Sequence, residues 1–370
     1  MSERAALGSP ALDDVVLFGG AASALSLGVI CWRWPAALPW LFWTWLLLID
    51  GPHLLATGLR SWADPSRGAE DAAWRRWAWL AFALPLLAWL SARLVPQARG
   101  MDLLLALAVV LSWHHQLRQN EGIMAILQAQ SQSQSIAAAR AIALAERRWM
   151  VAWLWAAFVA SALWTPANRA QWQLGAEATP LLDAASCIAL ALMAACCVMY
   201  LAQARQRVRN GLSLRPWCFG LMASGALLTL AVLLFGWAEP MYAQARSSEQ
   251  MFMAVTLIVG WSHGTQYLLV VLASHRRRVH RAGSWLAASA QRPLLTLAAL
   301  AALSIVAYGA INAAKGTLPL LQWAEASSAL AQAAMALYWA VFFHHYVVDR
   351  YIWRVGASPL LRRELGLAHG

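Results

Sequence analysis

The chain has 370 residues, of which 61% are hydrophobic and only 12% are charged, and it contains 23 tryptophans. This composition excludes an ordinary soluble globule, because apolar runs repeatedly reach the roughly 20 residues that cross about 30 Å of hydrocarbon. A net charge of +11 would suggest nucleic-acid binding in a soluble protein. Here the basic residues flank apolar runs, so membrane orientation and anionic headgroups explain them, and we expect no nucleic-acid partner.

The apolar runs predict an all-α, polytopic integral membrane protein, folded as one helical domain over residues 1–370. About ten transmembrane helices of spanning length can be drawn. In chain order they cover residues 15–32, 38–57, 74–94, 103–116, 150–164, 181–201, 217–237, 252–273, 294–311 and 329–348. The fourth is expected to continue as a helix to residue 127. The polar, alanine-rich stretch 128–148 is interpreted as a surface helix or loop.

The basic residues predict the orientation of these spans. The great majority of the 28 lysines and arginines fall in the N-terminal segment, in the loops after even-numbered spans and in the C-terminal tail. Because cytoplasmic loops carry an excess of Lys and Arg, both termini are expected in the cytoplasm. We therefore predict a protein of the bacterial inner membrane, with membrane lipids as partners. The sequence does not indicate an oligomeric state.

Four of the predicted spans carry polar residues that are costly inside a bilayer and therefore usually functional. These residues are Asp50 and His53 in the second span, His114 and His115 in the fourth, His263 and Gln266 in the eighth, and His344, His345 and Asp349 in or beside the tenth. All four spans are even-numbered, so their helices run in the same direction and the polar residues lie at similar depths. We expect them to converge in the bundle, as metal ligands do in other helix bundles.

The spacing within each span supports a metal site. Asp50 and His53 are three residues apart, and His345 and Asp349 are four apart, so each pair shares one helix face. Adjacent histidines point about 100° apart, so spacing does not choose between them. Imidazole together with carboxylate favours iron or manganese, and the acids serve as ligands or as partners of the histidines. The predicted metal ligands are His53, His114, His115, His263, His344, His345 and Asp349. Gln266 and Asp50 are the predicted catalytic residues, with Gln266 orienting a bound water or oxygen.

This histidine pattern resembles that of the Brp/Blh membrane family, whose members are carotenoid-cleaving non-haem iron dioxygenases. The resemblance rests on His53, His114 or His115, His263, and His344 or His345, and it implies a four-histidine iron site. The His-x-x-His-His boxes of membrane desaturases and hydroxylases are absent from the sequence.

The function predicted from the sequence is that of a membrane metal-dependent oxidoreductase or oxygenase. One or two iron ions would act on a lipophilic substrate that enters laterally from the membrane. Two alternatives remain open. Intramembrane His and Asp also line ion or proton paths in coupled transporters, and histidines on neighbouring helices bind haem in membrane electron carriers.

Overall fold

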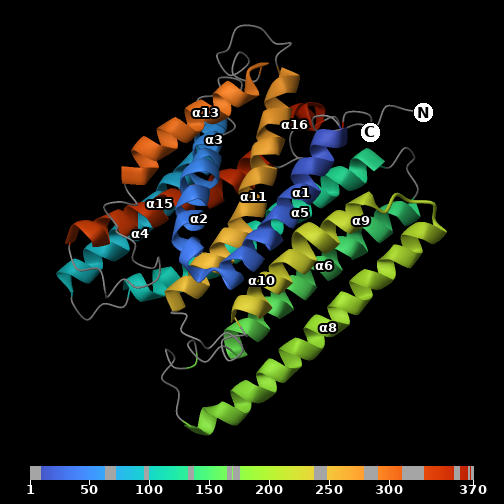
Figure 1. Ribbon diagram of the computed structural model, residues 1–370, viewed down its shortest axis with the longest axis horizontal. Helices are drawn as coiled ribbons and strands as arrows, with labels where there is room; N and C mark the ends of the chain where they lie inside the picture. Colours follow the sequence, from blue (N-terminus) through green and yellow to red (C-terminus); the bar gives the residue numbers. More distant parts are fainter. Residues whose placement is uncertain are drawn as a thin grey trace. The chain divides into compact units, whose positions relative to one another are not determined.

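The computed structural model is almost entirely helical over the residues that it describes, and no strand occurs among them (Figure 1). These residues are 10–62, 72–95, 100–131, 137–164, 169, 176–236, 248–278, 291–310, 329–353, 359–365 and 367. The first helices are α1 (Pro10–Arg33), η1 (Pro35–Ala37), α2 (Leu38–Trp45), η2 (Leu46–Asp50), α3 (Gly51–Trp62), α4 (Ala72–Leu94), α5 (Gly100–Ser131) and α6 (Ala137–Trp164). The others are η4 (Ala176–Ala178), α8 (Thr179–Arg209), α9 (Arg215–Phe219), η5 (Gly220–Ala226), α10 (Leu227–Gly236), α11 (Ser248–Arg278), α13 (Pro293–Leu303), η6 (Ser304–Tyr308), α15 (Ala329–Ile352) and α16 (Pro359–Glu364).

The all-helical class predicted from the sequence is confirmed for the described residues. Four of their helical segments are long and apolar enough to cross a membrane, namely Asp13–Arg33, Trp74–Leu94, Thr179–Arg209 and Met253–Ser274. Each of the four coincides with a predicted span. The described residues of the other predicted spans also fall on helices, but these helices are shorter or less apolar, and residues 237 and 311 lie outside the described residues.

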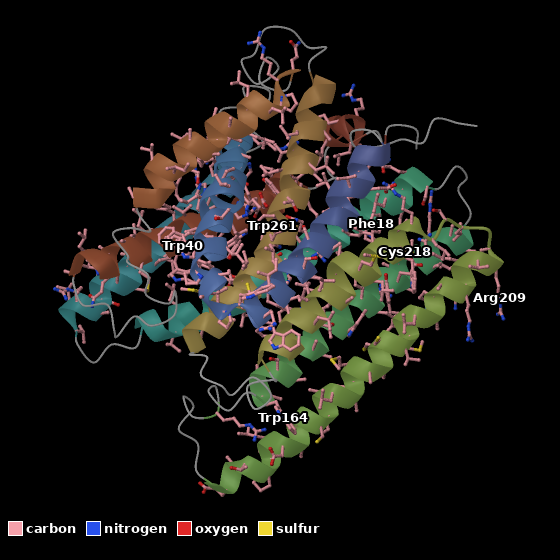
Figure 2. All side chains as sticks on the ribbon, in the orientation of Figure 1. Phe18, Trp40, Trp164, Arg209, Cys218 and Trp261 are labelled. Carbon is pink, nitrogen blue, oxygen red and sulfur yellow. The ribbon has the colours of Figure 1, made fainter. Side chains whose placement is uncertain are left out.

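Large apolar side chains face outward along several helices (Figure 2). Trp40 on α2 is 78% exposed, Leu181 on α8 is 72% exposed and Leu294 on α13 is 81% exposed. Water makes so much exposed apolar surface unfavourable, whereas lipid chains match it. Together with the four long apolar helices, this surface indicates a protein that inserts into a membrane.

Contacts within the chain divide it into two compact units. Unit 1 comprises Met1–Phe42 and Gln116–Gln266, and unit 2 comprises Trp43–His115 and Tyr267–Gly370. The boundaries fall inside α2, α5 and α11, so each of these helices contributes residues to both units.

Unit 1 is built around α6, which packs along α8 and against α10. Gly225 lies against the ring of Trp153, where any larger residue would overlap the indole. The stretch 128–148, expected at the surface, is instead partly buried. Most of it is helical, and Ile142 and Glu146 of α6 turn into the interior of unit 1.

Unit 2 is built around α15, which packs along α4 and against α3, while α13 also packs on α3. Trp74 and Ala78 of α4 meet Val348 and Ile352 of α15 in one buried apolar cluster. This packing sets the rotation of α15 about its own axis. It thereby decides which side chains of the His344–Asp349 segment face the interior.

Candidate metal centre

Three side chains of unit 2 place their donor atoms within 3.7 Å of one another. The Nε2 atoms of His115 and His345 lie 3.2 Å apart. Oδ2 of Asp349 lies 3.5 Å from Nε2 of His345 and 3.7 Å from Nε2 of His115. His345 and Asp349 share a face of α15 because they are four residues apart, and His115 comes from α5. Two imidazoles and one carboxylate therefore form a nearly equilateral triangle of donor atoms.

His53 of α3 packs beside this triangle. Its ring is edge-on to that of His345, with ring centres 4.4 Å apart, and it meets Tyr267 of α11 in the same way at 4.4 Å. Nδ1 of His53 lies 3.9 Å from Oδ1 of Asp50, which is too long for a hydrogen bond but close enough for electrostatic attraction. His53 is 1% exposed, so this imidazole is removed from solvent.

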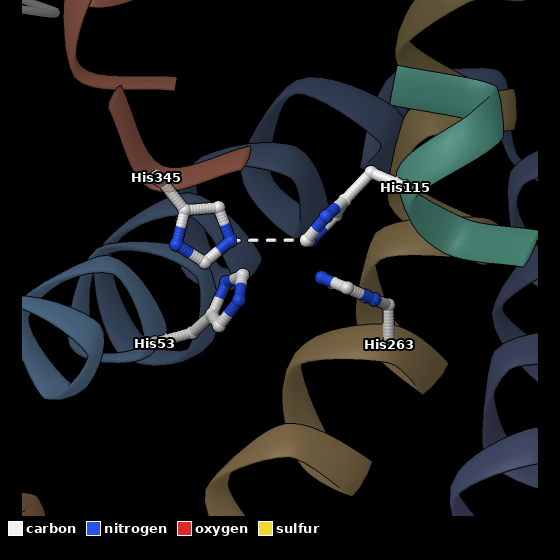
Figure 3. Close-up of side chains that lie close together, drawn as sticks. All are labelled: His53, His115, His263 and His345. Atoms are coloured by element: carbon white, nitrogen blue, oxygen red, sulfur yellow. Dashed lines mark hydrogen bonds between the residues drawn. The ribbon is translucent and has the colours of Figure 1, made fainter. Parts of the chain in front are cut away.

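His263 completes a group of four histidines. It lies on α11 one turn before Tyr267, on the same face of that continuous helix. One nitrogen from each of His53, His115, His263 and His345 lies within 4.8 Å of every other, and the four rings are turned toward one another (Figure 3). We call these four residues the histidine cluster.

The dimensions of the site fit a metal ion. Imidazole nitrogens bind such cations at about 2.0–2.1 Å, so two of them lie about 3 Å apart at neighbouring octahedral corners, about 3.4 Å apart at tetrahedral corners and at most about 4.2 Å apart across the ion. The triangle edges of 3.2, 3.5 and 3.7 Å lie within this range. Small ring rotations bring a 4.8 Å separation within range of one shared ion. The described residues therefore provide donors that can hold a metal ion.

The second oxygen of Asp349 is already engaged. Oδ1 accepts a hydrogen bond of 2.9 Å from the hydroxyl of Tyr267 and one of 3.3 Å from Oγ1 of Thr57. The hydroxyls of Thr57 and Tyr267 are themselves 2.5 Å apart. Partners of this kind orient metal-binding carboxylates and histidines, and they fix Oδ2 toward the two imidazoles.

A π-helical turn precedes His53. The ring of Pro52 would clash with the carbonyl of Leu48 in a regular α-helix, and Pro52 has no N–H to donate. The turn η2, from Leu46 to Asp50, is the wider π-helix, and α3 begins directly after it at Gly51. Such turns recur at functional sites. In this protein the turn ends on Asp50, three residues before a member of the histidine cluster.

The ring of His115 is supported by a neighbouring tyrosine. Tyr346 lies over it with ring centres 4.7 Å apart and the planes tilted by 33°. The hydroxyl of Tyr346 forms a 2.6 Å hydrogen bond with Oγ of Ser112, one turn before His115 on α5. This contact joins α5 to α15 beside the cluster.

The structure separates the two members of each adjacent histidine pair. His115 and His345 enter the cluster, whereas His114 is exposed on α5 and His344 lies among aromatic rings. The ring of His344 stacks on Trp62 at 5.8 Å and also contacts Trp79 and Phe82. Among the described residues, His114 and His344 are therefore not part of the donor group that could hold a metal ion.

The two predicted catalytic residues are both buried but differ in surroundings. Asp50 lies beside His53, as described above. Gln266 is fully buried on α11 and donates from Nε2 to Oγ of Ser262 at 3.0 Å. It is not among the residues whose donor atoms converge.

Sequence reasoning gave little weight to two residues at this site, Thr57 and Tyr267. Each follows a member of the cluster by four residues, Thr57 after His53 and Tyr267 after His263. A search for hydroxyls one turn from each candidate ligand would have found both.

A buried ion pair in unit 2 was also missed, because Arg60 was counted as a loop residue on the cytoplasmic side. Arg60 is fully buried, donates to Glu364 of α16 at 3.1 Å and to Ser274 of α11 at 2.6 Å, and lies over the ring of Trp353. We call Arg60 and Glu364 the Arg60 pair.

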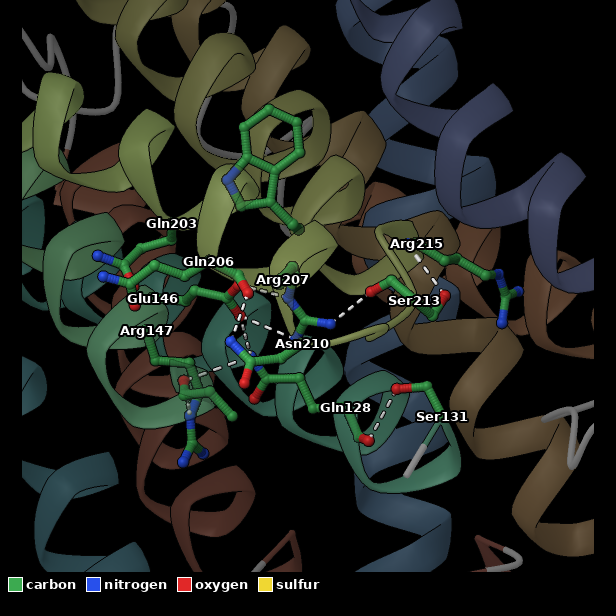
Figure 4. Close-up of polar contacts among 12 residues, drawn as sticks. Gln128, Ser131, Glu146, Arg147, Gln203, Gln206, Arg207, Asn210, Ser213 and Arg215 are labelled. Carbon is green, nitrogen blue, oxygen red and sulfur yellow. Dashed lines mark hydrogen bonds and ion pairs between the residues drawn. The ribbon is translucent and has the colours of Figure 1, made fainter. Parts of the chain in front are cut away.

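A second buried polar group was missed in unit 1 (Figure 4). The guanidinium of Arg207 binds both oxygens of Glu146 through Nε and Nη2, and its Nη1 donates to the carbonyl of Ser213. Gln128 adds a 2.8 Å hydrogen bond to Oε2 of Glu146. We call Gln128, Glu146, Arg207 and Ser213 the Glu146 cluster.

Comparisons of the chain with protein-family models, with curated proteins and with solved structures found no match. The resemblance to the Brp/Blh family therefore stays a prediction from the histidine pattern. The centre is defined by its own geometry, namely four histidines whose nitrogens converge and a carboxylate beside two of them.

Proposed function

We propose that the protein is an integral membrane metalloenzyme that uses non-haem iron to oxidise a lipophilic substrate. The observation that carries this proposal is the convergence of His115, His345 and Asp349 beside two further histidines. Two histidines and one carboxylate on one face of an ion are the ligand set of many non-haem iron oxygenases. Iron held in this way supplies redox chemistry with O2.

The buried charges of unit 2 favour a divalent cation. Asp50, Asp349 and Glu364 are all buried, and Glu364 is paired with Arg60. A buried charge is expensive unless it is paired, and a dication bound by the imidazoles and by Oδ2 of Asp349 would stabilise that carboxylate.

The surroundings of the centre favour an apolar substrate. The ligand-bearing helices are rich in apolar residues, and the Met253–Ser274 segment that carries His263 is itself apolar enough to span a membrane. A substrate dissolved in the bilayer would reach such a centre laterally between helices. In a dioxygenase reaction both atoms of O2 enter the products, so that reaction would need no separate reductant.

We also propose that the chain crosses the membrane about ten times with both termini in the cytoplasm. This orientation is supported by the excess of basic residues on one side of the predicted spans, which is typical of proteins in a bacterial inner membrane. Arg60 and Arg207 contribute less to that argument than the others, because both are buried in ion pairs. The histidine cluster would then lie toward the cytoplasmic side.

Haem fits this arrangement less well. Haem iron takes its protein ligands on the two faces of a large ring, whereas these donors surround a single point.

Transport of a metal ion would use the same donors as catalysis. The two functions differ in how tightly the ion is held, because a transported ion must leave.

The test is metal analysis with optical spectroscopy on detergent-purified protein, after dialysis against a weak chelator. We expect about one iron per chain, since the described residues form one such donor group, and no Soret band, since the proposed iron is bound without a porphyrin. His115→Ala and His345→Ala should lose the iron. The matched controls His114→Ala and His344→Ala, one residue away on the same helices, should retain it.

Protein that retains iron is then supplied with lipophilic substrates in vesicles while oxygen consumption is recorded. Consumption that depends on substrate and disappears in His345→Ala supports the oxygenase. Iron that is lost on dialysis and moves across vesicle membranes would instead favour transport. A native protein that takes up no metal, even on reconstitution, would exclude both.

A further inference from the structure

The two oxygens of Asp349 have different surroundings, and this difference carries a further inference. Oδ2 faces the Nε2 atoms of His345 and His115, at 3.5 and 3.7 Å. Oδ1 faces away from them and accepts hydrogen bonds from Tyr267 and Thr57. One carboxylate thus presents one oxygen to the imidazoles and one to hydroxyl groups.

We infer that Asp349 is a metal ligand through Oδ2 alone, and that Tyr267 is the positioning residue that keeps it so. This inference rests on the proposed function and deepens it. The histidine cluster offers four nitrogens, and Oδ2 of Asp349, which lies near two of them, would add a fifth donor. Iron that accepts six ligands would then keep one position open for a small exogenous ligand.

The hydrogen bonds to Oδ1 prevent the carboxylate from binding through both oxygens. To reach the ion, Oδ1 would have to leave the 2.9 Å bond from the hydroxyl of Tyr267. Tyr267 is 2% exposed, so water has little access to replace the lost acceptor. Thr57 stays beside the hydroxyl of Tyr267, but a hydrogen bond to a carboxylate is stronger than one between two hydroxyls, and the single-oxygen mode is thereby preferred.

The position of Tyr267 is itself fixed by residues of the site. Its hydroxyl is 2.5 Å from Oγ1 of Thr57, which lies 3.2 Å from the backbone carbonyl of His53, one turn earlier on α3. The ring of Tyr267 packs against the imidazole of His53. Tyr267, which restrains Asp349, is therefore held in place by Thr57 and His53 of α3, and His53 is itself a proposed ligand.

Removing only the hydroxyl of Tyr267 should change how Asp349 binds the ion. In Tyr267→Phe the ring and its packing remain, but Oδ1 loses its shorter hydrogen bond and becomes able to rotate onto the ion. Two-oxygen binding by Asp349 would fill the open position. The variant should therefore retain iron and lose affinity for a small ligand.

The experiment titrates azide into the ferric form of the full-length, detergent-purified protein and follows the azide-to-iron charge-transfer absorption. We expect the azide affinity of Tyr267→Phe to fall by about 10–100-fold, the factor that corresponds to the loss of one hydrogen bond to a charged group. Iron content should stay equal to that of the native protein. Tyr200→Phe is the matched control, because it also removes one buried tyrosine hydroxyl, which donates to the carbonyl of Trp217 in unit 1.

Thr57→Val provides a second variant that removes the other donor to Oδ1, and Thr57→Ser keeps it. We expect Thr57→Val to weaken azide binding less than Tyr267→Phe does, because its bond to Oδ1 is longer, and Thr57→Ser to restore it. Azide affinity unchanged in both Tyr267→Phe and Thr57→Val overturns the inference while leaving the iron centre in place. Loss of iron from Tyr267→Phe overturns it as well. A native protein without iron would show the proposed function itself to be wrong.

Discussion

The Glu146 cluster of unit 1 and the histidine cluster of unit 2 are both buried and polar, but they are composed differently. In the Glu146 cluster the donors of Arg207 and Gln128 meet the acceptors of Glu146 and Ser213. In the histidine cluster, imidazole nitrogens face one another and the carboxylate of Asp349 lies beside them, and all of these groups bind cations through their lone pairs. The Glu146 cluster thus combines opposite charges, whereas the histidine cluster brings together groups that all bind cations.

This difference separates a structural group from a binding site. Donors matched to acceptors inside one fold need nothing from outside, and they join α5, α6 and α8 firmly. Acceptors gathered together repel unless a proton or a cation lies between them. Burial alone is therefore a poor guide to function, whereas the balance of donors and acceptors distinguishes the two clusters.

The largest expected effect comes from breaking the matched cluster. Glu146→Ala or Arg207→Ala should lower the free energy of unfolding by about 3–5 kcal/mol, because each leaves a buried charge without its counter-ion. Unfolding in detergent, by heat or by denaturant, measures the change. The double variant Glu146→Leu, Arg207→Met should cost less than either single change, since no charge is left behind. A single change that costs under about 1 kcal/mol would contradict this account.

The next largest effect concerns the cation. Ferrous iron or zinc at about one hundred times its dissociation constant should stabilise the native protein by about 2.7 kcal/mol, because the ion binds the folded state. The shift in unfolding temperature on adding metal measures this effect. It should vanish in His345→Ala and persist in His344→Ala. If both variants were stabilised equally, the ion would bind elsewhere.

A smaller effect is expected at the edge of the Glu146 cluster. Gln128→Leu removes one hydrogen bond to a carboxylate that Arg207 still holds through two, and should cost about 1.5 kcal/mol. The same unfolding measurement applies, with iron content as a second readout that should not change. A loss of iron in this variant would show that the two clusters are coupled.

The smallest effect is expected at His114. This side chain is exposed, so His114→Ala should leave unfolding, metal content and azide binding as they are in the native protein. His115→Ala, the neighbouring change, should abolish metal binding. Equal behaviour of the two variants would mean that α5 faces the cluster in a different rotation.

The sequence alone was sufficient for the helices and for most of the centre. Apolar runs predicted where helices lie, and the polar residues of even-numbered spans predicted that His53, His263 and Asp349 come close to His115 and His345. The sequence could not show that His345, rather than His344, faces the other histidines. That depends on the rotation of α15 about its axis, which its packing on α4 sets.

The polar partners outside the centre were harder to predict. Glu146 lies in an alanine-rich, charged stretch whose composition is that of a surface helix, and only its contact with Arg207 accounts for its burial. Arg60 follows an apolar span, as topology-setting arginines do. In both cases the partner is distant in the sequence, and no local pattern reveals it.

The Arg60 pair also has a consequence for the order in which the protein is made. Arg60 and Glu364 are 304 residues apart in the chain. At synthesis rates of about 5–20 residues per second, Arg60 leaves the ribosome about 15–60 s before its counter-ion. Asp349 follows Thr57 by 292 residues, so the hydrogen-bonded surroundings of the proposed metal centre are likewise assembled late. Arg60 must meanwhile stay near water or headgroups, and α3 can settle into the interior only after α15 and α16 have been synthesised.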